Sequence, residues 1–87
     1  MEEEMLNKIY EHCSNNKEEL LKSEKCGCFN CLTIFDPKEI FEWIEFDEGE
    51  YTAFCPYCAI DSILPESDEY ELTEDLLKKM HKRWMES

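Results

Sequence analysis

The sequence contains two pairs of cysteines at the C-x-x-C spacing, Cys28-Phe-Asn-Cys31 and Cys55-Pro-Tyr-Cys58. Each pair at this spacing can wrap a tight turn around a metal ion and present two thiolates to it, and two such turns complete a tetrahedral shell. The sequence therefore predicts one structural Zn²⁺ bound by Cys28, Cys31, Cys55 and Cys58. Because four thiolates leave no coordination position for a reactive water, we expect a structural rather than a catalytic ion.

Two further cysteines lie outside these pairs. Cys26 could replace Cys28 as a ligand, because a C-x4-C spacing to Cys31 is also geometrically feasible, although C-x-x-C is the more common metal turn. Cys13 falls on the apolar face of the first expected helix, where a small buried side chain is expected. Neither cysteine has the features of a catalytic thiol.

The chain is too short to depend comfortably on a hydrophobic core alone. At 87 residues it is expected to form one domain, residues 1–87, and a domain of this size buries only about 60–65% of its unfolded surface. Structural zinc in small finger peptides contributes about 10–16 kcal/mol of binding free energy. We therefore expect a zinc-stabilised α+β domain, with a zinc-ribbon or treble-clef-like core and a short β-hairpin, flanked by N- and C-terminal helices. Its expected parts are a helical segment over residues 1–22, the zinc core over residues 26–64 and a helix over residues 73–86.

Hydrophobic periodicity predicts helices near both ends. Apolar residues recur every three or four positions between residues 5 and 13, which is the period of an amphipathic helix. Asn16 and Glu19 fit a capping box that opens a second short helix, unless the two pieces form one kinked helix. Thr73 is expected to cap the last helix, which carries acidic residues in its first turn and basic residues in its last. Its expected buried stripe comprises Leu76, Leu77, Met80 and Trp84.

The segment between the cysteine pairs carries a strong helix-start signal. Asp36 as N-cap, Pro37 at the first position and Glu39 as capping-box partner predict a helix over residues 37–45. Around it we expect a strand over 32–35, a turn over 47–49, a strand over 51–54, a strand or helical turn over 59–64 and a solvated loop over 66–71.

Two aromatic residues in the expected helix over 37–45 are candidates for contact with a partner. That segment is apolar around more than one face, so not all of its side chains can enter the core. Phe41 and Trp43 are the large side chains that could anchor a partner protein or a second copy of the chain, since aromatic residues often dominate interface energetics.

The strongly acidic composition restricts the class of partner. The formal net charge is −13, from 22 acidic and 9 basic residues, and this disfavours nucleic acid because phosphates would be repelled. The charge favours either a basic protein partner or no partner, and the acidic surface could also imitate nucleic acid toward a basic enzyme. The acidic start has no secretory signal, and no apolar run reaches the roughly 18 residues of a membrane helix, so we expect a cytoplasmic protein.

The sequence also offers two enzymatic alternatives to a binding role. Cys55-Pro-Tyr-Cys58 matches the glutaredoxin motif and could serve a thiol–disulfide oxidoreductase, but residues 59–87 leave too little chain for the rest of that sheet. A metal-dependent nuclease on a treble-clef core would need a histidine, and only His12 and His81 are available, on predicted helices near the two ends. We therefore expect no enzymatic activity.

From about residue 23 onward, several motifs occur together: Cys26-Gly-Cys-Phe-Asn-Cys31, Ile34-Phe-Asp-Pro-Lys-Glu-Ile40, Glu42-Trp43, Thr52-Ala53, Cys55-Pro-Tyr-Cys-Ala-Ile-Asp-Ser-Ile63 and the apolar stripe of the last helix with His81. In these motifs the chain resembles a family of small bacterial proteins described only as cytoplasmic proteins. The resemblance implies a zinc-binding fold in bacterial or phage-derived proteins and no reaction that can be transferred. Together with the composition, it leads us to expect a non-enzymatic interaction module with a regulatory or inhibitory role.

The chain departs from this family pattern at two places. Ala59 stands where the family tends to have glycine, and a left-handed backbone there would cost alanine about 1 kcal/mol or more. Residues 65–70 replace a glycine-containing turn with an acidic segment. Such a segment would fit a specialised copy, for example a phage protein that acts on a host factor.

Overall fold

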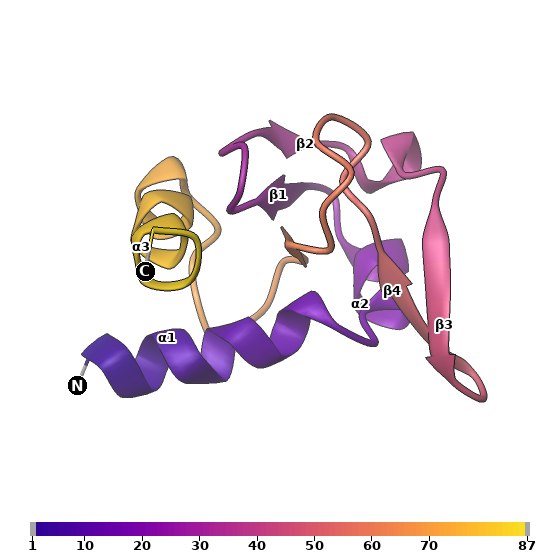
Figure 1. Ribbon diagram of the computed structural model, residues 1–87, viewed down its shortest axis with the longest axis horizontal. Coiled ribbons are helices and arrows are strands. Elements are labelled where there is room, and N and C mark those ends of the chain that lie inside the picture. Colours follow the sequence, from indigo (N-terminus) through magenta and orange to yellow (C-terminus); the bar gives the residue numbers. More distant parts are fainter. Residues whose placement is uncertain (1, 87) are drawn as a thin grey trace.

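A computed structural model describes residues 2–86, and Met1 and Ser87, the limits of the predicted domain, lie outside the described residues (Figure 1). Its helices are α1 (Glu2–Tyr10), α2 (Lys17–Lys22) and α3 (Glu74–Trp84), with two short 3-10 helices, η1 (Glu11–Cys13) and η2 (Pro37–Glu39). Its strands are β1 (Cys26–Cys28), β2 (Ile34–Phe35), β3 (Trp43–Asp47), β4 (Glu50–Ala53) and β5 (Ile63–Leu64). The predicted α+β class, with helices at both ends, is confirmed at this level.

The strands form two small antiparallel sheets. One has the order β2-β1-β5, and the other is the hairpin of β3 and β4, which turns at Gly49 with a positive φ of 84°. Gly27 lies in the middle strand, where an added Cβ would come within 2.9 Å of the Leu77 side chain. Glycine therefore lets α3 pack closely on the sheet.

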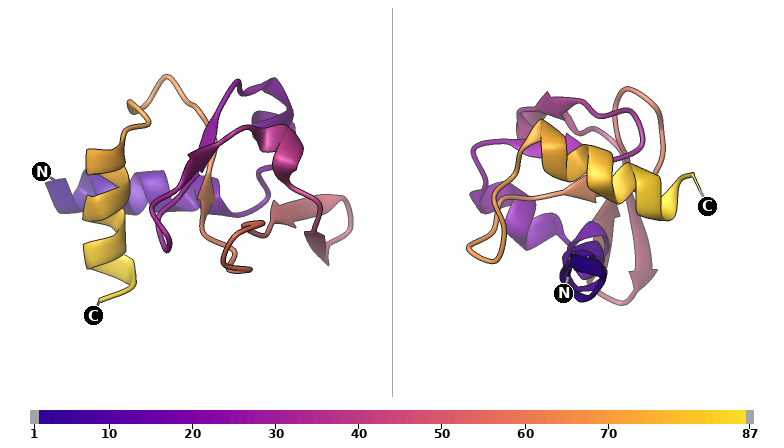
Figure 2. Two further views of the ribbon diagram at one scale, coloured as in Figure 1. Left: turned by 90° about the horizontal axis from the view of Figure 1, so that it is seen from above. Right: turned by 90° about the vertical axis from the view of Figure 1, so that its left-hand side faces the viewer.

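The three-stranded sheet separates two groups of buried side chains. One group packs α1 and α3 onto the sheet and comprises Leu6, Ile9, Cys13, Phe29, Leu64, Leu72, Leu76, Leu77 and Met80. The other lies on the cysteine side and comprises Leu20, Cys26, Cys28, Phe35, Ile40, Ala53, Cys55 and Ile63. Figures 1 and 2 show α3 crossing α1 at one end of the molecule and the β3–β4 hairpin at the other.

The terminal helices follow the sequence predictions closely. Residues 5–13 are helical through α1 and η1, and residues 14–16 interrupt the helix before α2. Thr73 caps α3, since its Oγ1 accepts a hydrogen bond from the Leu76 amide at 3.1 Å. The predicted stripe of α3 is buried at its first three positions, and Trp84 is half-buried with its ring stacked on Tyr10 at 4.0 Å between centroids.

The predicted capping box of Asn16 and Glu19 is wrong, because Asn16 is used for long-range hydrogen bonds instead. Its side chain is fully buried and makes no cap bond to α2. Its Nδ2 donates to the carbonyls of His12 at 3.1 Å and Ile63 at 3.0 Å, and its Oδ1 accepts from the Ala53 amide at 3.3 Å. Asn16 thus joins the N-terminal helices to both sheets.

The predicted helix over residues 37–45 is also wrong beyond its first turn. The capping contacts are present, since Asp36 Oδ1 accepts from the Lys38 amide at 2.9 Å and Glu39 Oε2 accepts from the Asp36 amide at 3.2 Å. They start only η2, after which the chain becomes extended at Ile40. The following aromatic and β-branched residues favour a strand, and pairing with β4 outweighs the local helix signal.

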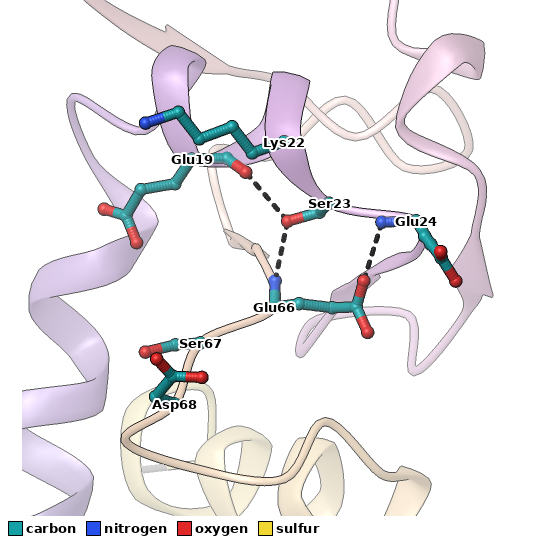
Figure 3. A pocket seen from close by; sticks show the side chains of 7 residues that line it. All are labelled: Glu19, Lys22, Ser23, Glu24, Glu66, Ser67 and Asp68. Carbon is teal, nitrogen blue, oxygen red and sulfur yellow. Dashed lines mark hydrogen bonds between the residues drawn. The ribbon is translucent and has the colours of Figure 1, made fainter.

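The acidic segment over residues 66–71 is anchored at its start rather than fully solvated. Figure 3 shows the hollow between this segment and the end of α2, which is lined by the carboxylates of Glu19, Glu24, Glu66 and Asp68. The Glu66 carboxylate accepts hydrogen bonds from the Glu24 amide at 2.6 Å and the Lys25 amide at 3.2 Å. The Glu66 amide donates to Ser23 Oγ at 3.0 Å. These bonds attach the loop to the end of α2.

Candidate metal centre

Four cysteine sulfurs converge between the two sheets. The Sγ atoms of Cys28, Cys31, Cys55 and Cys58 all lie within 4.8 Å of one another, and among residues 2–86 they form the one such group of potential metal ligands. The sulfurs of Cys28 and Cys58 are 3.5 Å apart, and those of Cys31 and Cys55 are 3.6 Å apart. Cys28 and Cys55 are buried, whereas Cys31 and Cys58 are half-buried. All four predicted ligands are therefore brought together.

Neither of the other two cysteines joins this group. Cys26 is fully buried, and its sulfur lies 3.5 Å from the carbonyl oxygen of Phe35. Cys13 is buried beside α1 and α3, as the helical periodicity predicted. Burial raises the pKa of the Cys26 thiol to about 12 and that of the Cys13 thiol to about 11. Both thiols are thus expected to remain protonated and unreactive at neutral pH.

The two cysteine turns share one hydrogen-bond pattern. In the first turn, the Cys28 amide donates to the carbonyl of Thr33 at 3.0 Å, the Leu32 amide to the carbonyl of Cys28 at 2.8 Å, and the Asn30 amide to Cys28 Sγ at 3.4 Å. In the second, the Cys55 amide donates to the carbonyl of Ile60 at 2.9 Å, the Ala59 amide to the carbonyl of Cys55 at 2.9 Å, and the Tyr57 amide to Cys55 Sγ at 3.4 Å. The amide donors aimed at sulfur are suited to stabilise a thiolate.

Each turn closes on a residue with a left-handed backbone. Leu32 and Ala59 both have a φ of 62°. A left-handed backbone at Ala59 was considered from the sequence, because the family pattern tends to have glycine there. No sequence feature indicated the same conformation at Leu32. A side chain in this conformation costs about 1–2 kcal/mol relative to glycine, so both turns carry local strain that the rest of the fold stabilises.

Ala59→Gly is expected to stabilise the protein by about 0.5–1 kcal/mol, because glycine adopts the left-handed conformation without a steric cost. Ala59 is exposed, so little packing is lost. The gain should appear as a higher midpoint of urea denaturation. The matched control is Ala53→Gly, which places glycine in the buried strand β4 and should destabilise the protein. Equal signs for the two variants would contradict this account.

Two hydroxyl groups touch the sulfur cluster and were not identified from the sequence. Ser62 Oγ lies 3.0 Å from Cys28 Sγ, and Thr33 Oγ1 lies 3.4 Å from Cys31 Sγ. Ser62 is almost fully buried. The Ser62 contact arises only when β1 pairs with β5, so sequence spacing alone did not reveal it, whereas the Thr33 contact lies within the first cysteine turn.

Burial and hydrogen bonding act differently on the individual thiols. Burial raises the pKa of Cys28 far above the ordinary value, although the hydrogen bond with Ser62 opposes it. Burial likewise raises the pKa of Cys55 to about 11. At Cys31 burial also favours the thiol, but hydrogen bonds with Thr33 prevail and lower the pKa to about 7. At neutral pH, Cys28 and Cys55 therefore favour the thiol form, and binding of a cation that converts them to thiolates would release protons.

The arrangement fits a thiolate-binding metal. A tetrahedron with Zn–S bonds of about 2.3 Å has edges of about 3.7 Å, close to two of the sulfur separations, which are 3.5 and 3.6 Å, while all the sulfurs lie within 4.8 Å of one another. Soft thiolate donors are used for zinc, copper(I) and iron–sulfur sites. The residues present could thus hold one metal ion, and the sulfur positions leave the kind of metal undecided.

Of the two predicted interaction residues, the structure exposes one and partly buries the other. Phe41 is 76% exposed, whereas Trp43 is half-buried against the cysteine side of the core. Lys17 Nζ lies 5.6 Å from the centre of the Trp43 ring and 4.7 Å from that of Tyr51. Trp43 is the first residue of strand β3 and Phe41 lies just before that strand, so neither residue is on a helix.

The two histidines of the nuclease alternative have structural partners. His12 bridges two carboxylates, with Nδ1 2.8 Å from Glu19 and Nε2 2.7 Å from Glu69. His81 Nδ1 lies 3.0 Å from the Phe29 carbonyl oxygen. His12 therefore ties η1 to α2 and to the acidic loop, and His81 ties α3 to the first cysteine turn.

The His12 bridge is expected to make stability depend on pH. Burial lowers the pKa of His12, but the hydrogen bonds with Glu69 and Glu19 outweigh it, so the pKa rises above the ordinary 6.5. The stabilisation by protonated His12 is complete below the unfolded pKa and is lost as the pH rises through the folded pKa. The difference in Tm between wild type and His12→Gln should therefore shrink as the pH rises from about 6.5 through the raised pKa of folded His12. Glu69→Gln, the control, should weaken this dependence, and a constant difference would contradict it.

No helix within residues 2–86 has both the length and the apolar character needed to cross a membrane. Comparisons of the chain with protein-family models, with curated proteins and with solved structures found no match.

Proposed function

We propose that this protein is a non-enzymatic interaction module whose fold is held together by one structural Zn²⁺ bound to Cys28, Cys31, Cys55 and Cys58. The observation that carries the zinc assignment is the convergence of four sulfurs within 4.8 Å. Amide groups directed at two of these sulfurs support thiolate ligation. None of the six cysteines forms a disulfide, which suits a reducing compartment such as the cytoplasm.

The surroundings of the second cysteine pair argue against a thiol–disulfide oxidoreductase. A redox-active C-x-x-C motif needs a partly exposed nucleophilic cysteine, commonly at a helix N-terminus. Here Cys55 is only 3% exposed, and residues 56–58 form a turn with no helix after it. Its sulfur also lies 3.6 Å from Cys31, a member of the other pair. The shared cluster accounts for both pairs together, which the redox alternative does not.

A binding role follows from what remains at the surface. The net charge of −13 favours a basic protein over nucleic acid, and electrostatic attraction of this kind mainly affects association rate and specificity. Regulation or inhibition of such a partner by contact is the role that we propose. A second copy of the chain is a less suitable partner, because two strongly acidic surfaces would repel each other.

The metal and the binding role are tested separately. Native mass spectrometry and elemental analysis of the purified full chain should give one zinc per molecule, with the four ligand thiols protected from alkylation. Cross-linking and co-purification in the source organism should identify a basic protein, whose affinity for the purified chain, measured by calorimetry, should fall as salt is raised. A metal-free folded chain would overturn the zinc assignment, and metal-dependent catalysis by the pure protein would overturn the non-enzymatic role.

A further inference from the structure

The two outer edges of the β3–β4 hairpin differ in their hydrogen-bond partners. The outer edge of β4 is closed by Asn16, whose amide donates to the Tyr51 carbonyl at 3.0 Å and whose Oδ1 accepts from the Ala53 amide at 3.3 Å. Asn16 therefore takes the place that a further strand would occupy. Along β3, in the part of the chain that the structure describes, the only strand partner is β4.

The register shows which backbone groups of β3 point outward. The Phe54 amide donates to the Glu42 carbonyl at 3.0 Å, so these two residues form a hydrogen-bonded pair. Hydrogen-bonded pairs alternate along an antiparallel ladder, so Ile44 also bonds toward β4 while Trp43 and Glu45 direct their amide and carbonyl groups away from it. Figure 1 shows β3 as the outermost element at this end of the molecule. Two residues thus offer an unpaired strand edge.

Exposed apolar side chains flank this edge. Phe41, just before the strand, is 76% exposed, and Ile44 within it is 36% exposed. A cleft of about 140 Å³ lies beside the start of the strand and is lined by four apolar residues, Leu20, Leu21, Pro37 and Trp43, together with Ser23, Asp36 and Lys38. Leu21 is 71% exposed. Side chains of a strand added along β3 would point alternately to the side of this cleft and to the side of Ile44.

The negative charge around β3 determines which kind of segment can pair with this strand. The hairpin carries Glu42, Glu45, Asp47, Glu48 and Glu50, so a second copy paired through β3 would bring carboxylates together, and like charges opposite each other destabilise a strand pair. A segment with lysine or arginine at alternate positions would face these carboxylates favourably. The irregular register between Glu45 and Asp47 limits regular pairing to the first half of the strand.

We propose that the outer edge of β3 is a docking site for an extended, lysine- or arginine-bearing segment of a partner protein, which adds to the hairpin as a third strand. This proposal rests on the proposed interaction function and specifies its surface. Backbone groups of Trp43 and Glu45 provide hydrogen bonds, the cleft beside Trp43 receives an apolar side chain, and the carboxylates select basic residues.

The test uses random linear peptides of about ten residues, displayed and selected on the zinc-loaded full chain. We expect enrichment of peptides in which basic residues alternate with apolar or β-branched ones. In a selected peptide, N-methylation should weaken binding by about tenfold or more at alternate positions only, because only alternate amides face β3. Glu45→Pro, which removes an outward amide, should weaken binding to a similar extent. Glu45→Gln keeps the acceptor for the Gly49 amide and should cause a smaller loss.

Several outcomes would overturn the proposal. These are the absence of any enriched peptide, enrichment of acidic or helical peptides, an N-methylation effect without alternation, and a dimer in sedimentation that Glu45→Pro dissociates. The N-methylated peptides keep the test decisive even if the proline variant does not fold. If a captured partner protein binds wild type and a folded Glu45→Pro variant equally, the docking site is wrong while the interaction function stands.

Discussion

Replacing Cys58 by serine is expected to abolish the cooperative thermal transition of this protein. Under the proposed zinc assignment, the substitution removes one of four thiolate ligands. Structural zinc contributes about 10–16 kcal/mol in small zinc domains, and a typical domain has a total stability of about 5–15 kcal/mol. Losing even part of the zinc-binding free energy would therefore remove most of the free energy of unfolding, because the two small groups of buried side chains cannot stabilise the fold alone. Circular dichroism during heating, with zinc analysis of the same sample, measures both effects.

The matched control is Cys26→Ser. Cys26 is fully buried, whereas Cys58 is only half-buried, so burial alone would make the Cys26 substitution the more costly one. Cys26 lies outside the sulfur cluster, and a serine hydroxyl there could donate to the nearby Phe35 carbonyl. We expect a cost of about 1–2 kcal/mol with zinc retained. A Cys58→Ser protein as stable as the Cys26→Ser protein would contradict metal ligation.

The cysteine cluster could be predicted from sequence because its information is local. Each C-x-x-C pair specifies its own turn, and the only remaining requirement was that the two turns meet. The contact of Ser62 with Cys28 depends on pairing between β1 and β5, and the left-handed backbone of Leu32 has no marker in its residue type. Such details of the site follow from tertiary structure and could not be derived from spacing.

The helices show the same division between local and long-range information. Helix α3 has its cap, its charge order and its apolar stripe within a dozen residues, and it was predicted correctly. The capping box at Asp36 was equally clear, yet its helix ends after one turn because residues 43–47 pair with a strand further along the chain. The aromatic and β-branched residues on both sides of the turn at residues 47–49 were the available hairpin signal.

The long-range hydrogen bonds of Asn16 were not predicted from the sequence. Substitution of Asn16 by aspartate is expected to lower the stability of the protein strongly. The Asn16 Nδ2 group donates to the carbonyls of His12 and Ile63, and an ionised carboxylate can donate to neither. Two carbonyls would lose their donor, and a charge would be buried without a cationic partner at hydrogen-bond distance. We expect Asn16→Asp to cost about 3–5 kcal/mol, which corresponds to a fall in Tm of about 12–40 °C for a domain of this size.

The control for this prediction is the same substitution at an exposed position. Asn7 lies on α1 and accepts hydrogen bonds through Oδ1 from Arg83 Nε at 3.2 Å and Nη2 at 3.1 Å. Aspartate keeps these acceptors and adds an attractive charge, so Asn7→Asp should change stability by less than about 0.5 kcal/mol. Urea denaturation of both variants at neutral pH gives the comparison. Similar costs at the two positions would mean that the hydrogen bonds of Asn16 do not stabilise the fold.

The pH dependence of Asn16→Asp separates lost hydrogen bonds from buried charge. Burial among carbonyl groups should raise the pKa of the introduced carboxyl in the folded state, so the variant loses stability relative to wild type as the pH rises through that pKa. Lowering the pH should recover part of the deficit, because a protonated carboxyl can donate to one of the two carbonyls. The unrecovered part reports the second lost bond, because aspartate keeps the backbone amide and the Oδ1 acceptor that close the β4 edge.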